Sequence, residues 1–142
     1  MTGSRSNFAD VGEFHQKMGL HNVTFGEPGP RTDLSPYEMD KLIDFRVDFM
    51  QEELNEFMDA YDAKDDAKMF DALLDLAYVV KGTAHLLGYP WQAGWDRVQE
   101  ANMKKERATS ADMSKRRSEL DVIKPEGWTP PDIEGLLAEY GF

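Results

Sequence analysis

Apolar side chains recur at helical spacing over residues 36–63. Steps of four and three residues build one apolar stripe from Ile43, Val47, Met50, Leu54, Phe57 and Tyr61. A second face, about 120° round the same helix, begins apolar and becomes acidic halfway along; it carries Leu42, Phe45, Phe49, Glu53, Glu56 and Ala60. Glu52 falls at the edge of this second face. We therefore expect one long helix whose acidic positions lie in a contact with another helix.

A partner helix is predicted over residues 67–87. It is apolar on nearly every side, which is typical of a central helix. One more polar seam runs along it at steps of four and three residues, formed by Asp71, Asp75, Tyr78, Gly82 and His85. The short polar stretch 62–66 would make the two helices antiparallel neighbours.

The two acidic clusters lie at similar distances from this turn, the glutamates about 10 residues before it and the aspartates about 9 after it. At a rise of about 1.5 Å per residue, both clusters reach the same height. The sequence thus predicts that four or five carboxylates converge, from Glu52, Glu53, Glu56, Asp71 and Asp75.

Converging carboxylates repel one another unless some are protonated or a cation neutralises them. Oxygen ligands without cysteine favour a hard ion, Mg²⁺ or alternatively Mn²⁺. The competing interpretation is a solvated acidic helix face, and for Glu52 taken alone the two interpretations stand level. Two aspartates within or beside a long apolar run favour the cation site for the others.

The pattern before the long helix predicts a short helix over residues 7–18 and a loop over 24–33 rich in Gly and Pro. Ser35, Pro36 and Glu38 have the arrangement of a capping box at the start of the long helix. His15, in the first helix, is interpreted as a packing or surface residue rather than a ligand.

A fourth helix is predicted over residues 91–107. Its seam is apolar at first and ends in Asn102 and Lys105, which with Lys104 and Arg107 are suited to bind phosphate oxygens. The alternative is a solvated basic helix end that complements the helix dipole. Residues 108–124 are interpreted as a linker or mobile flap, and residues 129–139 as a last helix capped by Thr129. Trp128 would anchor this tail, or less favourably stack on a base.

Composition narrows the class of protein. A chain of 142 residues is the length of one domain, so we expect residues 1–142 to form a single domain with its core over about 36–107, followed by a linker and C-terminal tail. The net charge of −11 argues against a nucleic-acid polymer or an anionic membrane as partner. No apolar segment follows a basic start, and the one long apolar helix carries charges, so a cytoplasmic protein is expected.

Glu52-Glu53-x-x-Glu56, a spacer, and Asp75-Leu-Ala-Tyr-Val-Val resemble the MazG-like all-α nucleoside triphosphate pyrophosphohydrolases. The family signature is EExxE, then ExxD, then Asn and Lys on the next helix, which Asn102-Met-Lys-Lys105 matches. Phe14-His15 with Gly19, and the tail Lys124-Pro-Glu-Gly-Trp128, are also similar to the dUTP-hydrolysing and phage-type members. One position departs: the glutamate of ExxD would stand at Ala72, and the nearby acid is Asp71.

The resemblance implies an antiparallel four-helix module, with short extra helices at both ends, that assembles as a homodimer or a dimer of dimers. It implies Mg²⁺-dependent cleavage of a nucleoside triphosphate to a monophosphate and pyrophosphate. The metal ligands would be Glu53, Glu56, Asp71 and Asp75, with Glu52 and Lys105 catalytic. The substrate would contact Asn102, Lys104, Lys105 and Tyr78.

Three alternatives remain open at this point. The enzyme could be a specialist for dUTP or phosphoribosyl-ATP, since residues that bind the base lie outside the motif. A helical interaction module with a degenerate metal site would accord with the shifted Asp71. A di-iron bundle is disfavoured, because it needs Glu-x-x-His on two helices, and Tyr78 stands three residues after Asp75.

Overall fold

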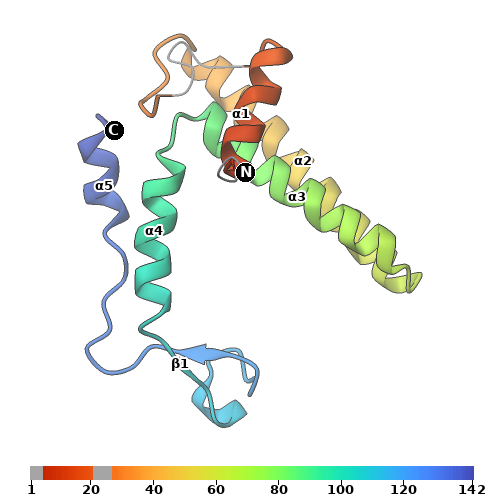
Figure 1. Ribbon diagram of the computed structural model, residues 1–142, viewed down its shortest axis with the longest axis vertical. Helices are drawn as coiled ribbons and strands as arrows, with labels where there is room; N and C mark the ends of the chain where they lie inside the picture. The colour runs from red at the N-terminus through yellow and green to blue at the C-terminus, as the bar shows by residue number, and fades with distance from the viewer. Residues whose placement is uncertain (1–4, 21–26) are drawn as a thin grey trace. The chain divides into compact units, whose positions relative to one another are not determined.

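The computed structural model describes residues 5–20 and 27–142, and within these ranges the chain is mainly helical (Figure 1). The described α-helices are α1 (Asn7–Lys17), α2 (Pro36–Asp62), α3 (Asp66–Leu86), α4 (Trp91–Asn102) and α5 (Ile133–Glu139). Between α4 and α5 lie a short 3₁₀ helix, η1 (Ala111–Met113), and two strands of two residues each, β1 (Glu106–Arg107) and β2 (Val122–Ile123). The predicted all-α class is confirmed, with this small strand pair added.

The chain divides into two compact units. The first comprises Met1–Trp91 and Tyr140–Phe142, and the second comprises Gln92–Glu139. None of the described helices is long and apolar enough to cross a membrane. The expected loop over 24–33 has no regular secondary structure from residue 27 onward, while residues 24–26 lie outside the described part of the chain.

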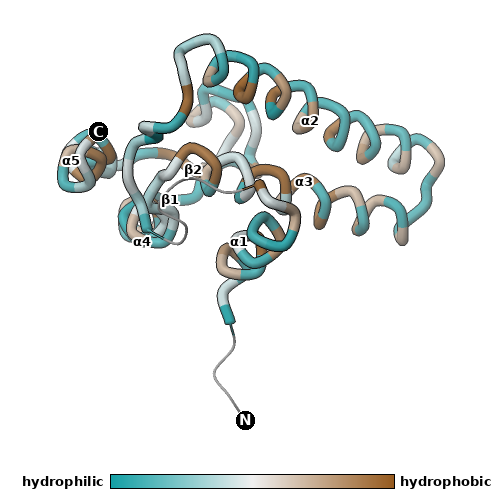
Figure 2. Tube along the Cα trace, turned by 90° about the horizontal axis from the view of Figure 1, so that it is seen from above, coloured by the Kyte–Doolittle hydropathy of each residue, from teal (hydrophilic) through white to brown (hydrophobic). Residues whose placement is uncertain are grey.

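The hairpin of α2 and α3 is the main feature of the first unit (Figures 1 and 2). The predicted capping box starts α2: Ser35 Oγ accepts from the Glu38 N–H at 3.1 Å, and the Glu38 carboxylate accepts from the Ser35 N–H at 3.2 Å. Lys64 adopts a positive φ of 55° in the turn. Asp65 then caps α3 by accepting from the Lys68 N–H at 3.0 Å.

The two helices pack through a narrow seam. The buried residues of α2 are Arg46, Glu53 and Ala60, spaced seven apart, and small Ala72 on α3 is also buried. The predicted placement of Glu53 and Ala60 on the inner face is therefore confirmed. Phe45, which was expected on the contact face, is exposed. Much of the first apolar stripe is also exposed, together with Met58 of α2 and large apolar residues of α3; the exposed residues are Ile43, Phe45, Val47, Leu54, Met58, Tyr61, Phe70, Leu73, Leu74 and Tyr78.

Helix α1 packs on α3 through two histidines. Nδ1 of His15 lies 2.9 Å from Nδ1 of His85, so one ring donates and the other accepts. Burial, with His85 and Arg46 adding to it, lowers the pKa of His15 to about 4, so this ring is neutral near pH 7. Arg46 donates to Val79 O at 3.0 Å and to Thr83 Oγ1 at 3.1 Å. The interpretation of His15 as a packing residue agrees with its burial.

The second unit departs from the expected helix ends. Helix α4 ends at Asn102, so the prediction that it continues to Arg107 and carries Lys105 is wrong. The chain turns there and enters β1, which pairs antiparallel with β2. The last helix begins at Ile133 rather than near Thr129. Its cap is Asp132, whose Oδ1 accepts from the Gly135 N–H at 2.8 Å, because an acceptor must stand directly before the first turn.

Trp128 holds the tail of the second unit to α4, as the sequence predicts. Its indole Nε1–H donates to the backbone oxygen of Ala101 at 2.8 Å. Arg97 of α4 adds a second link by donating to Asp132 O at 2.7 Å.

Candidate metal and phosphate site

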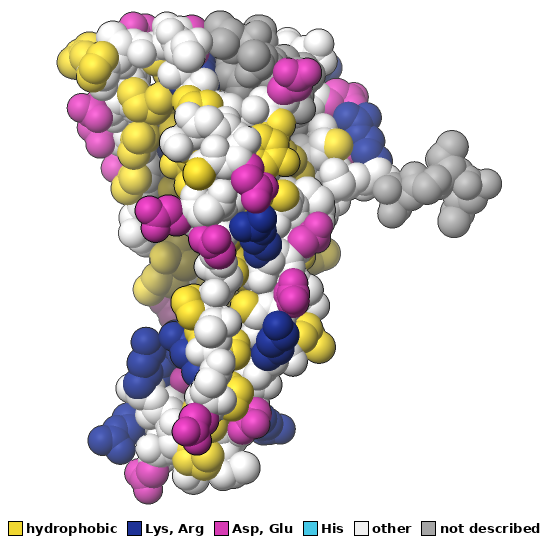
Figure 3. All heavy atoms as spheres, turned by 90° about the vertical axis from the view of Figure 1, so that its left-hand side faces the viewer, with side chains coloured by type: hydrophobic (Ala, Val, Ile, Leu, Met, Phe, Trp, Pro, Cys, Tyr) yellow, Lys and Arg dark blue, Asp and Glu magenta, His cyan; other side chains and the backbone are white. Residues whose placement is uncertain are grey.

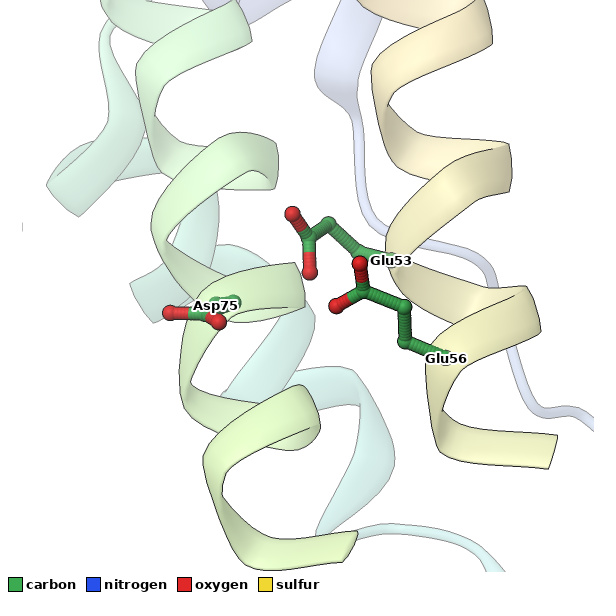
Figure 4. Close-up of side chains that lie close together, drawn as sticks. All are labelled: Glu53, Glu56 and Asp75. Atoms are coloured by element: carbon green, nitrogen blue, oxygen red, sulfur yellow. The ribbon is translucent and has the colours of Figure 1, made fainter. Parts of the chain in front are cut away.

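Three carboxylates from the α2–α3 hairpin come together. Glu53 and Glu56 lie one turn apart on α2 and extend toward α3, which carries Asp75 (Figure 4). One oxygen from each carboxylate lies within 4.8 Å of the others. The convergence of Glu53, Glu56 and Asp75 inferred from the spacing of the turn is therefore present in the structure.

Glu53 is the buried member of this carboxylate cluster, with 7% of its surface exposed. Its Oε2 is buried and makes no hydrogen bond to any described residue. Burial, followed by the charge of Glu56 and a hydrogen bond with it, raises the pKa of Glu53 to about 7. Without a cation, Glu53 therefore stays protonated at pH values at which an ordinary carboxyl group is already ionised.

The pKa of Asp75, on the facing helix α3, is also raised. Burial, then the charges of Asp71 and Glu56, raises its pKa. The charge of Asp71 is thus close enough to raise the pKa of Asp75, but Asp71 is not one of the three residues whose carboxylate oxygens converge. Glu52 is exposed and adds its charge to the environment of Glu53 from the edge of the cluster. The roles expected for Asp71 as a metal ligand and for Glu52 as a catalytic residue therefore remain predictions.

The remaining predicted site residues lie in two places. Tyr78 follows Asp75 by one turn of α3, is 41% exposed, and meets the Phe14 ring edge-on at 5.6 Å. Asn102 ends α4 in the second unit, where Lys104 lies 3.5 Å from Glu100 and the Lys105 ammonium lies 5.2 Å from the centre of the Trp128 ring. Their contact with substrate remains a prediction.

The carboxylate cluster fits a hard divalent cation. A buried carboxylate oxygen without a hydrogen-bond partner among the described residues is costly, and ligation would satisfy it. A divalent ion would also offset the repulsion that raises the Glu53 and Asp75 pKa values. Carboxylate oxygens are ligands that Mg²⁺ and Mn²⁺ accept while keeping waters in other positions.

Sequence reasoning missed Arg46, which lies one heptad before Glu53 on the same buried seam of α2. It is 6% exposed and its guanidinium lies 5.3 Å from the centre of the Phe49 ring. Its seven-residue spacing from Glu53 places Arg46 on the same face of α2, whereas its burial depends on acceptors at Val79 and Thr83, far along the chain.

The comparison with known families agrees with this geometry. The family model described as phosphoribosyl-ATP pyrophosphohydrolase matches residues 12–102, a range that contains every residue of the carboxylate cluster. No curated protein shows significant similarity to the chain. Enzymes of the matched family are pyrophosphohydrolases that act on phosphoric anhydrides, and they are typically metal-dependent. The chain belongs to the phosphoribosyl-ATP pyrophosphohydrolase family, within the MazG-like all-α nucleoside triphosphate pyrophosphohydrolase superfamily.

Proposed function

We propose that this enzyme uses Mg²⁺, or Mn²⁺ in its place, to hydrolyse the bond between the α- and β-phosphates of a nucleotide. The products are a nucleoside monophosphate, or its phosphoribosyl derivative, and pyrophosphate. The observation that carries the proposal is the carboxylate cluster of Glu53, Glu56 and Asp75, in which a buried oxygen of Glu53 lacks a hydrogen-bond partner among the described residues. Membership of the family supplies the reaction class.

The side chains divide the work as follows in this proposal. Glu53, Glu56 and Asp75 hold the cation, with Asp71 as a further ligand beside Asp75. When bound, the cation supplies positive charge to the phosphate oxygens. Glu53 must release its proton before it can act as a ligand, because only the carboxylate binds well.

Glu52, which is exposed at the edge of the carboxylate cluster, activates the attacking water. It orients the water and accepts its proton as the water oxygen bonds to the α-phosphorus and pyrophosphate leaves. Asn102, Lys104 and Lys105 bind phosphate oxygens, with Lys105 stabilising charge that develops during cleavage. Tyr78 contacts the substrate from α3. The whole chain acts as one MazG-like domain in this scheme.

Phosphoribosyl-ATP is the first substrate to test, because the matched family is described by it. Deoxynucleoside triphosphates, dUTP among them, are the second candidate. They are supported by Phe14-His15 and Gly19 near the start and by the Lys124–Trp128 tail, which resemble the dUTP-hydrolysing and phage-type members.

Pyrophosphate release in Mg²⁺ from a panel of phosphoribosyl-ATP, dNTPs and NTPs tests the reaction and its substrate together. Release from at least one compound, abolished in Asp75→Asn, is expected. Asp48→Asn, which removes an exposed carboxylate from α2 outside the cluster, should leave the rate unchanged. Absence of pyrophosphate from every compound would instead favour a helical interaction module.

We also propose that two or more copies associate through the α2–α3 hairpin. Large apolar residues of both helices, among them Leu54, Tyr61, Phe70 and Leu74, are 42% to 64% exposed in the single chain. Such a surface is more than a stable monomer normally leaves in water, and a second hairpin would complete a four-helix bundle as a homodimer or a dimer of dimers.

Light scattering after gel filtration should therefore give a mass of at least two chains. Leu54→Glu combined with Leu74→Glu should reduce it toward one chain, whereas Gln51→Glu, which adds one negative charge beside the stripe, should not. A wild-type mass of one chain at micromolar concentration would contradict the association.

A further inference from the structure

The second unit contains a basic pocket of about 340 Å³, formed around the ends of β1 and β2. Its charged lining residues are Lys105, Lys115, Arg116, Lys124 and Asp121. Four cations therefore face one anion in a chain whose net charge is −11. Figure 3 shows Lys and Arg side chains gathered around the segment that carries β1 in Figure 1.

The one acidic lining residue, Asp121, has several hydrogen bonds within the pocket wall. Its carboxylate accepts from Ser114 Oγ at 2.6 Å, from the Val122 N–H at 2.9 Å and from Arg116 Nη1 at 3.1 Å. The bond from Ser114, with the others, holds the pKa of Asp121 below its usual range. Asp121 thus holds the loop and Arg116 in position, and its charge is already shared among three donors.

Strand pairing brings two of the cations to the same end of the strand pair. Glu106 pairs with Ile123, and Lys105 and Lys124 are the next residues beyond this pair. Like charges at such positions repel. Both ammonium groups also lie close to one indole, at 5.2 Å and 5.1 Å from the centre of the Trp128 ring. The ring compensates only part of the repulsion.

The local charge has the opposite sign to that of the chain. Residues 104–124 carry seven basic side chains and four acidic ones. Repulsion among cations that share a pocket is relieved by a multivalent anion, and an oligophosphate presents several oxygens to Arg and Lys at once. Arg116, which is paired with Asp121 and is still 67% exposed, lines the pocket with three lysines and is suited to such a group.

We propose that the basic pocket is an oligophosphate subsite, in which Lys115, Arg116 and Lys124 join Lys105 in binding the pyrophosphate portion of the nucleotide substrate and of the released product. The identity of the anion rests on the proposed function. The pocket itself is formed by residues of the second unit, so its anion binding does not require the carboxylate cluster or a metal ion.

Calorimetric titration of the full-length protein with inorganic pyrophosphate, in EDTA and low salt, tests the subsite. Arg116→Gln and Lys115→Gln should each weaken binding by about tenfold, the loss of one charge-assisted contact. Arg117→Gln is the matched control: Arg117 is the exposed neighbour, lies outside the pocket lining and pairs at 3.5 Å with exposed Asp112. The NMR signal of the Trp128 indole N–H reports both folding of the variants and occupancy of the pocket.

Pyrophosphate should bind more tightly than orthophosphate, shift the Trp128 signal, and lose affinity in the pocket variants alone. Absence of binding, or an equal loss in Arg117→Gln, would overturn the subsite even if the enzyme cleaves nucleotides. Binding to this pocket by a protein that releases no pyrophosphate from any nucleotide would instead refute the proposed reaction and leave the anion site standing. In an active enzyme, Lys115→Gln should raise KM for the nucleotide more than it lowers kcat.

Discussion

Glu53 of α2 and Asp75 of α3 bring carboxylate oxygens within 4.8 Å of one another across the hairpin. Each carboxyl group has a pKa raised first by burial and then by neighbouring acids. Folding therefore brings together charges that repel, and a divalent cation between them would convert this cost into affinity. Carboxylates held together at a cost in folding free energy are typical of a functional site rather than of a structural core.

Metal binding should depend strongly on pH. The Glu53 pKa is about 7 in the fold and 4.5 in the unfolded chain. The metal-free fold is thus favoured while Glu53 is protonated, and it loses that contribution as pH rises from about 4.5 through 7. Mg²⁺ must displace the proton, so its affinity should rise with pH, by at most about tenfold per unit, and level off above 7.

Thermal unfolding with and without Mg²⁺ at pH 5.5 and pH 8 measures this effect. The increase in Tm on adding Mg²⁺ should be larger at pH 8, and Glu53→Gln should remove the difference. Equal increases at the two pH values would show that Glu53 does not exchange a proton for the metal.

Ala72 stands at the position where the ExxD pattern of the resemblance would require glutamate, and it is 4% exposed. Ala72→Glu should add a carboxylate to the lining of the pocket that also contains Glu56 and Asp71. Without metal, this buried charge should lower stability by about 2 kcal/mol, and Mg²⁺ should restore most of the loss. Ala72→Gln has nearly the same size and no charge, so it should gain no extra Mg²⁺-induced stability. A chemical denaturation series gives both values, and identical Mg²⁺ responses of the two variants would count against a cation at this height of the hairpin.

A larger residue at Gly82 should lower the stability of the protein, because a Cβ there would lie 2.6 Å from Arg46 Nη2 and 3.1 Å from the His15 ring. Gly82→Ala would push Arg46 away from Val79 O, and we expect a net loss of about 1 to 3 kcal/mol despite the higher helix propensity of alanine. At Gly94 in α4, the nearest atom is Leu136 Cδ2 at 3.8 Å, so Gly94→Ala should be neutral or stabilising. Urea unfolding of the two variants checks the contrast; equal effects would mean that Arg46 can move at little cost.

Local signals in the sequence were sufficient for much of the first unit. The capping box of Ser35 and Glu38 predicted the start of α2, and turn arithmetic brought Glu53 to the height of Asp75. These features depend on residues a few positions apart, or on the fixed rise of a helix. Periodicity did not predict that the stripe from Ile43 to Tyr61 stays largely exposed, since that stripe is as apolar as a core.

Features set by distant contacts escaped the sequence. The burial of Arg46 depends on backbone and hydroxyl acceptors at Val79 and Thr83, more than thirty residues later. The end of α4 before Lys105 follows from pairing between β1 and β2, and two-residue strands leave no periodic pattern. The basic pocket depends on the same pairing, and the interpretation of residues 108–124 as a linker or mobile flap does not predict it.

The proposed reaction requires that the carboxylate cluster hold the cation on which pyrophosphate release depends. The decisive measurement is Mg²⁺-dependent pyrophosphate release by Glu53→Gln, compared with wild type and Asp48→Asn at equal helicity by circular dichroism. We predict that the rate of pyrophosphate release falls at least a hundredfold in Glu53→Gln and stays at the wild-type value in Asp48→Asn. An amide in place of a buried carboxylate ligand weakens metal binding. A folded Glu53→Gln that releases pyrophosphate at the wild-type rate would contradict the account.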